Sequence, residues 1–126
     1  MDPENLRAVP LFASMSETDL RKIATFAQED SAPEGATLMR EGDFSNDMIA
    51  IESGTAEVTR DGQHIRELGP GDVFGEIGVI ERQQRTASVV ARSPMRLIRL
   101  TNWDVKRLPR ETRDRLVEIV EDRRPT

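Results

Sequence analysis

The sequence predicts a mainly β protein, an antiparallel β-barrel or jelly roll (a double-stranded β-helix) flanked by N-terminal and C-terminal α-helices. All eight glycines lie between residues 35 and 78, and none lies in the flanking parts. Glycine accepts the positive φ of tight strand connections, so this distribution predicts many short strands joined by turns. The hydrophobic residues recur at helical spacing near both ends and alternate in the centre, which supports the same architecture.

Size and composition favour one soluble domain. A chain of 126 residues fits a single core, with N-terminal helices over 1–30, the barrel over 31–100 and C-terminal helices over 101–124. The apolar runs are too short to cross a bilayer and the acidic start is not a signal peptide, so no membrane contact and a cytoplasmic location are expected. The net charge of −5 argues against nucleic-acid binding by this chain alone.

The N-terminal part predicts a short helix and turn around Pro10, followed by a longer helix. Ser16 to Asp19 form a capping-box pattern, which places the helix start at Glu17. Apolar residues then follow at helical spacing: Leu20, Ile23, Ala24 and Ala27. We therefore expect a helix over Glu17–Gln28.

The central region predicts six strands with Gly or Pro punctuation between them. The expected strands are Ala36–Arg40, Asp47–Ser53, Thr55–Arg60, Gln63–Leu68, Arg85–Arg92 and Met95–Leu100. Asp61-Gly62 is the clearest hairpin turn, because both residues tolerate the left-handed conformation that a two-residue turn requires. Antiparallel strands of this spacing are typical of a barrel or jelly roll.

The C-terminal part predicts two helices. A capping pattern at Thr101–Asp104 begins a short helix that ends before Pro109, and a second helix covers Arg110–Arg123. The second helix has an apolar side: Leu116, Val117, Ile119 and Val120. This side can pack on the barrel, act as a mobile lid, or contact an effector protein or a second copy of the chain.

The segment from Gly71 to Val90 carries the candidate site. Arg85 shares strand parity with small apolar residues. If this face lines the barrel interior, Arg85 is a cation inside a cavity that requires an anionic partner, either Glu76 or a ligand phosphate. Gly75 and Gly78 allow close approach to the backbone, and a helical turn there would direct N–H groups at a phosphate. Glu76, an acceptor, suits a sugar hydroxyl. This chemistry fits a small ligand with a hydroxyl and a phosphate.

The residues Gly71–Gly78 and Arg85–Ala87 closely resemble the phosphate-binding cassette of the cyclic nucleotide-binding domain family. The resemblance implies that Glu76 accepts from the ribose 2′-hydroxyl and that Arg85 pairs with the cyclic phosphate. The backbone N–H groups of Gly78 and Thr86 would contribute, and Gly75 would pack close to the ribose. The binding residues expected from the resemblance are Gly75, Glu76, Ile77, Gly78, Arg85 and Thr86.

The resemblance implies a regulatory module that binds cAMP, or less favourably cGMP, and repositions its C-terminal helices. The alternative is a structural or protein-interaction domain of the same fold that binds no nucleotide. An enzyme is not expected, because the sequence shows no nucleophile with an activating base. A cupin-like metal enzyme would need several histidines, whereas His64 is the only one and no cysteine is present, so no metal is expected.

Overall fold

The structure, a computed structural model, describes residues 1–42, 47–75 and 87–123. Its strands form two four-stranded antiparallel sheets, which pack as a β-sandwich of the jelly-roll type. The first sheet has the order β1 (Gln28–Ala32), β8 (Met95–Thr101), β3 (Asp47–Ser53) and β6 (Val73–Gly75). The second has the order β2 (Thr37–Met39), β7 (Ser88–Ala91), β4 (Ala56–Arg60) and β5 (Gln63–Leu68). The predicted fold class is confirmed.

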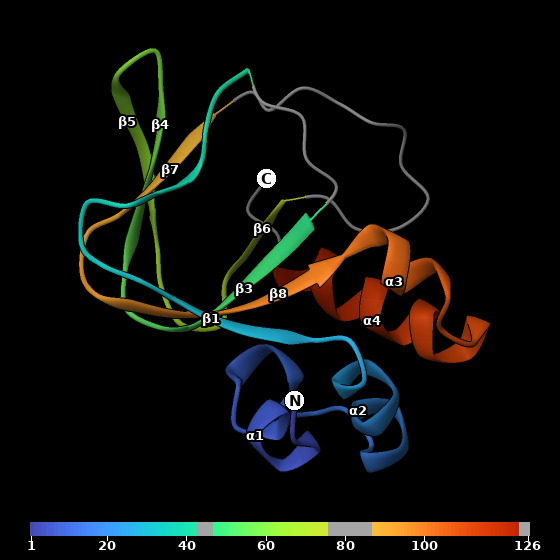
Figure 1. Ribbon diagram of the computed structural model, residues 1–126. Helices are drawn as coiled ribbons and strands as arrows, with labels where there is room; N and C mark the ends of the chain where they lie inside the picture. Colours follow the sequence, from blue (N-terminus) through green and yellow to red (C-terminus); the bar gives the residue numbers. More distant parts are fainter. Residues whose placement is uncertain (43–46, 76–86, 124–126) are drawn as a thin grey trace.

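The helices gather on one side of the first sheet (Figure 1). At the N-terminus are α1 (Pro3–Arg7), the 3₁₀ helix η1 (Pro10–Phe12) and α2 (Glu17–Ala24), and at the C-terminus α3 (Asn102–Lys106) and α4 (Arg110–Arg123). The two predicted caps are present: Ser16 Oγ accepts from the Asp19 N–H, and Thr101 Oγ1 from the Asp104 N–H. No helix in the described parts of the chain is both long and apolar enough to cross a bilayer.

Two strand segments were missed by the sequence prediction. The helix expected to reach Gln28 ends at Ala24, and Gln28 instead begins β1. Four of the five residues of β1 are exposed, so no alternation of apolar residues marks it, and it forms by backbone pairing with β8. The second missed strand, β6, is only three residues long and lies where a glycine turn was expected.

Alternation along the first sheet divides the core into two clusters. Met48, Ala50 and Ile98 face the helices and join their apolar residues. Ile49 and Leu97, on the opposite face, join residues of the second sheet. The hairpin prediction also holds, since Asp61 and Gly62 have φ of 53° and 77° between β4 and β5.

A buried carboxylate joins the N-terminal helices to α4. Asp19 of α2 is 1% exposed and accepts from Thr112 Oγ1 at 2.8 Å. Arg115 donates to both oxygens of the same carboxylate, from Nε at 2.5 Å and from Nη2 at 2.9 Å. A bidentate pair of this kind fixes direction as well as distance. Together with buried Leu116 and Val120, it holds α4 against the N-terminal helices.

This contact makes the stability of the fold depend on pH. The hydrogen bonds from Arg115, aided by Thr112 and opposed by burial, lower the pKa of Asp19 from 3.8 to about 2. Because the folded state binds this proton more weakly than the unfolded state, ionised Asp19 stabilises the fold at neutral pH. The contribution is complete above about pH 4 and is lost as the pH falls towards 2.

We predict that Asp19→Asn lowers the free energy of unfolding by about 1–3 kcal/mol at pH 7, because the pairing with Arg115 loses its charge and a buried polar group loses a partner. The difference from wild type should shrink as the pH is lowered to 2. Urea unfolding between pH 2 and 7 measures this, with Glu17→Gln, an exposed acid of the same helix, as the control. Equal stability of Asp19→Asn and wild type at pH 7 would contradict it.

Candidate functional site

One of the six predicted site residues, Gly75, lies within the described residues. It is the last residue of β6, in the first sheet, and β7 of the second sheet begins at Ser88. Glu76, Ile77, Gly78, Arg85 and Thr86 lie outside the described residues. The described flanks of the candidate site therefore come from both sheets, and each flank is held in place by its own contacts.

Gly75 makes the tightest backbone approach at this site. Its φ is +99°, a conformation that favours glycine. It pairs in register with Met48 of β3, and a Cβ added to it would lie 2.3 Å from the carbonyl oxygen of Asp47. Any side chain at this position would meet backbone rather than a movable side chain. The close approach observed at Gly75 is to strand β3, and the approach of a ligand to this glycine stays a prediction.

The turn that leads into β6 is anchored at several points. The Asp72 carboxylate accepts from the Gly69 N–H at 2.8 Å, which closes the turn. Backbone hydrogen bonds join Asp72 and Gly71 to Ile51 of β3 at 3.0 and 3.1 Å. Phe74 is 7% exposed and packs between the sheets. These contacts hold the first part of the candidate cassette, from Gly71 to Gly75, against the first sheet.

The other flank begins at Ala87, which is buried. Ala87, Val89 and Ala91 are all below 8% exposed, as the strand parity predicted for the face that Arg85 was expected to share. Ser88 Oγ accepts from the Glu41 N–H at 2.9 Å, which joins the start of β7 to the residues after β2. The parity argument therefore holds for the described part of the strand.

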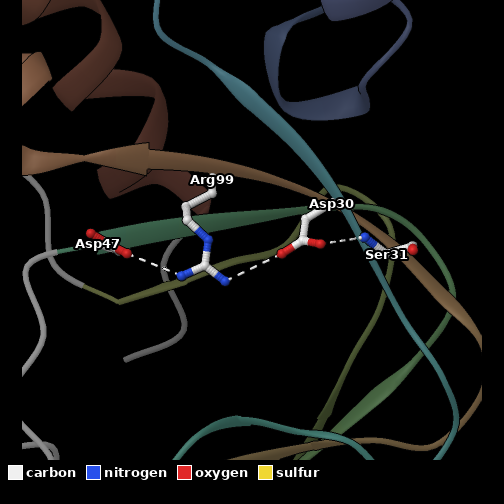
Figure 2. Close-up of polar contacts among 4 residues, drawn as sticks. All are labelled: Asp30, Ser31, Asp47 and Arg99. Carbon is white, nitrogen blue, oxygen red and sulfur yellow. Dashed lines mark hydrogen bonds and ion pairs between the residues drawn. The ribbon is translucent and has the colours of Figure 1, made fainter.

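A group of charged residues adjoins Gly75 that the sequence did not reveal. Arg99 of β8 donates from Nη1 to Asp47 Oδ2 at 3.0 Å and from Nη2 to Asp30 Oδ2 at 3.5 Å (Figure 2). Arg99 shares strand parity with Leu97, on the face that turns away from the helices. Asp30 belongs to β1, the missed strand, so no local pattern indicated that these three residues meet.

His64 does not form part of this site. It lies on β5, exposed, with Nδ1 3.0 Å from Glu57 Oε2. The hydrogen bond from Arg92 lowers the pKa of the Glu57 carboxyl most, and the hydrogen bond with His64 lowers it further. Within the described residues, no three His, Cys, Asp or Glu side chains come together as a metal centre requires.

The sequence of this chain matches a known protein family. Residues 29–112 match the cyclic nucleotide-binding domain model. The chain is 31% identical to the cAMP-dependent protein kinase regulatory subunit of Aspergillus niger, over 82% of this chain and 26% of that protein. It is 33% identical to cGMP-dependent protein kinase, isozyme 1, of Drosophila melanogaster, over 71% of this chain and 12% of that protein. The chain thus spans about a quarter or less of the curated relatives it matches.

A solved structure supports the same assignment at the level of the fold. A cyclic nucleotide-binding domain from Methylobacillus flagellatus KT superposes with a TM-score of 0.82 at 24% identity, over 96% of this chain and 79% of that one. The matched family region contains β6, Gly75 and β7, the described flanks of the candidate site. Since the family model covers well over half of the 126 residues, the chain belongs to the cyclic nucleotide-binding domain family.

Proposed function

We propose that this chain is a regulatory module that binds a cyclic purine mononucleotide, cAMP in preference to cGMP, through the cassette at residues 71–90. The observation that carries the proposal is the end of β6. The family match includes this segment, and Gly75 there combines a positive φ with a backbone approach that leaves no room for a side chain. The intact sequence FGE, followed by Arg-Thr-Ala at the family's spacing, supports the same ligand.

Each remaining cassette residue has a role in this proposal. Glu76 accepts a hydrogen bond from the ribose 2′-hydroxyl, because an ionised carboxylate is only an acceptor. Arg85 pairs with the cyclic phosphate, whose two exocyclic oxygens suit a planar guanidinium. The N–H groups of Gly78 and Thr86 add hydrogen bonds to the ligand, and Ile77 holds the turn in the core. The result is a site that tests for a sugar hydroxyl and a phosphate together.

The preference for cAMP rests on the relatives. The first matches are cAMP-dependent protein kinase regulatory subunits, while cGMP-dependent kinases also match at similar identity. Thr86 is the residue that we propose takes part in the choice of purine, through its side-chain hydroxyl. The regulatory subunits also support a binding role without catalysis, and we propose no reaction for this chain.

The signal in this proposal is a change in the position of α3 and α4. Ile119 of α4 is only partly buried and lines an open groove that α2 and the residues before it share. The apolar side of α4 is therefore not fully covered, which leaves surface for a lid contact, an effector protein or a second copy. The nucleotide can shift α4 only as far as its affinities for the two helix positions differ.

We predict that Arg85→Ala weakens cAMP binding by about 3–5 kcal/mol, because the phosphate loses its charged partner in a sheltered site. Calorimetric titration with cAMP and cGMP measures the effect. Arg82→Ala, an arginine in the same segment, is the matched control and should bind as wild type does. Unchanged affinity in Arg85→Ala would refute the assignment. Wild type that binds neither nucleotide at millimolar concentration would favour the protein-interaction alternative.

We also predict that Gly75→Ala destabilises the fold by more than Gly62→Ala does. Both glycines have positive φ, a strain of about 1–3 kcal/mol for alanine, but only at Gly75 would the new Cβ meet backbone. Because the new Cβ would push the end of β6 away from Asp47, cAMP binding should weaken in Gly75→Ala and not in Gly62→Ala. Thermal unfolding and calorimetric titration of the two variants measure these effects. Equal losses of stability and of cAMP affinity in both variants would contradict the role of the Gly75–Asp47 contact.

A further inference from the structure

Arg99 ties together three strands beside the end of β6. Its guanidinium lies between the Asp30 carboxylate of β1 and the Asp47 carboxylate of β3 (Figure 2). The side chain of Arg99 is 36% exposed and that of Asp47 is 27% exposed, so this is a half-buried pair at the rim of the sheet. Such partly exposed pairs add little to the stability of the fold, so a role for Arg99 has to come from the residues that it positions.

The position of Arg99 is unusual for its face of β8. Leu97 has the same parity and is 2% exposed, in the cluster between the two sheets. Ile49, which is paired in register with Arg99, is 5% exposed in that cluster. The charged side chain of Arg99 therefore lies next to the apolar residues Leu97 and Ile49, at the end of the sheet nearest to Gly75. Two carboxylates hold it there.

Asp47 connects this cation to Gly75. Its carboxylate accepts from Arg99, while its carbonyl oxygen occupies the space that a Cβ of Gly75 would need. The two contacts come from one residue at the first position of β3. The side-chain contact and the peptide against which Gly75 rests therefore belong to the same residue.

We propose that Arg99 is a positioning residue for the nucleotide site: through Asp47 it fixes the place where β6 ends at Gly75 and thereby sets the affinity for the ligand. This proposal rests on the function proposed above. Arg99 need not contact the nucleotide, since its effect passes through the backbone of β3. Contiguous contacts of this kind change binding by roughly 3- to 30-fold when one member is removed.

The same sheet contains a matched control. Arg96, also on β8, pairs with Glu29 of β1 and with Glu52 of β3, the latter at 3.6 Å. It thus joins the same three strands through one acid on each side. Arg96, however, has the opposite parity and is paired in register with Ser53, at the far end of β3 from Asp47. Loss of Arg96 removes a comparable cross-strand contact without touching the support of Gly75.

The test compares Arg99→Gln, Arg99→Lys and Arg96→Gln with wild type. Calorimetry with cAMP should show roughly 3- to 30-fold weaker binding in Arg99→Gln and wild-type affinity in Arg96→Gln, with similar melting temperatures for the two. Arg99→Lys should recover most of the affinity, because an ammonium still pairs with Asp47. Without nucleotide, hydrogen exchange of the Val73–Gly75 amides should be faster in Arg99→Gln than in Arg96→Gln.

The two measurements separate this inference from the proposed function. Equal cAMP affinity in Arg99→Gln and wild type, or an equal loss in Arg96→Gln, would overturn the positioning role. If wild type binds no cyclic nucleotide, the proposed function fails and the link to affinity fails with it. The exchange of the β6 amides then still decides whether Arg99 positions Gly75, since that measurement needs no ligand.

Discussion

The arrangement of this molecule depends on one backbone contact, between Gly75 at the end of β6 and the Asp47 carbonyl at the start of β3. It requires a residue with no side chain and a positive φ, so the amino-acid type is set by space and conformation together. The candidate cassette, residues 71–90, includes this contact in the first sheet and β7 in the second sheet, so its described parts depend on how the two sheets are held.

The packing of the two sheets and the helices holds the described parts of the cassette in place. The first sheet is covered by the helices on one face and by the second sheet on the other, with an apolar cluster on each side. This double burial makes β3 and β8 a rigid support for β6 and for the arginine that lies between Asp30 and Asp47. The C-terminal helix α4 belongs to the other cluster and is joined to α2 through the buried Asp19. The Arg99 contacts and α4 thus lie on opposite faces of one sheet.

The sequence predicted those features that local patterns determine. The capping residues Ser16 and Thr101, the Asp61-Gly62 turn and the buried parity of Val89 are each marked by residues close in the chain. It missed β1, whose exposed polar residues are held by pairing with β8, about seventy positions away in sequence. The Arg99 bridge was missed for the same reason, because Asp30, Asp47 and Arg99 meet only through the sheet topology. The roles of the cassette residues came from the family resemblance, and five of the six predicted site residues lie outside the described residues.

We propose that the end of β6, resting on Asp47, forms one wall of a cyclic nucleotide site. The most direct test of this proposal is an amide NMR titration of the isotope-labelled protein with cAMP. If Gly75 lies in the wall of the site, the Gly75 and Asp47 amide signals shift together and saturate with a single dissociation constant. Signals of Gly75 and Asp47 that stay unchanged while the protein binds cAMP elsewhere, or that never respond to the nucleotide, would contradict it.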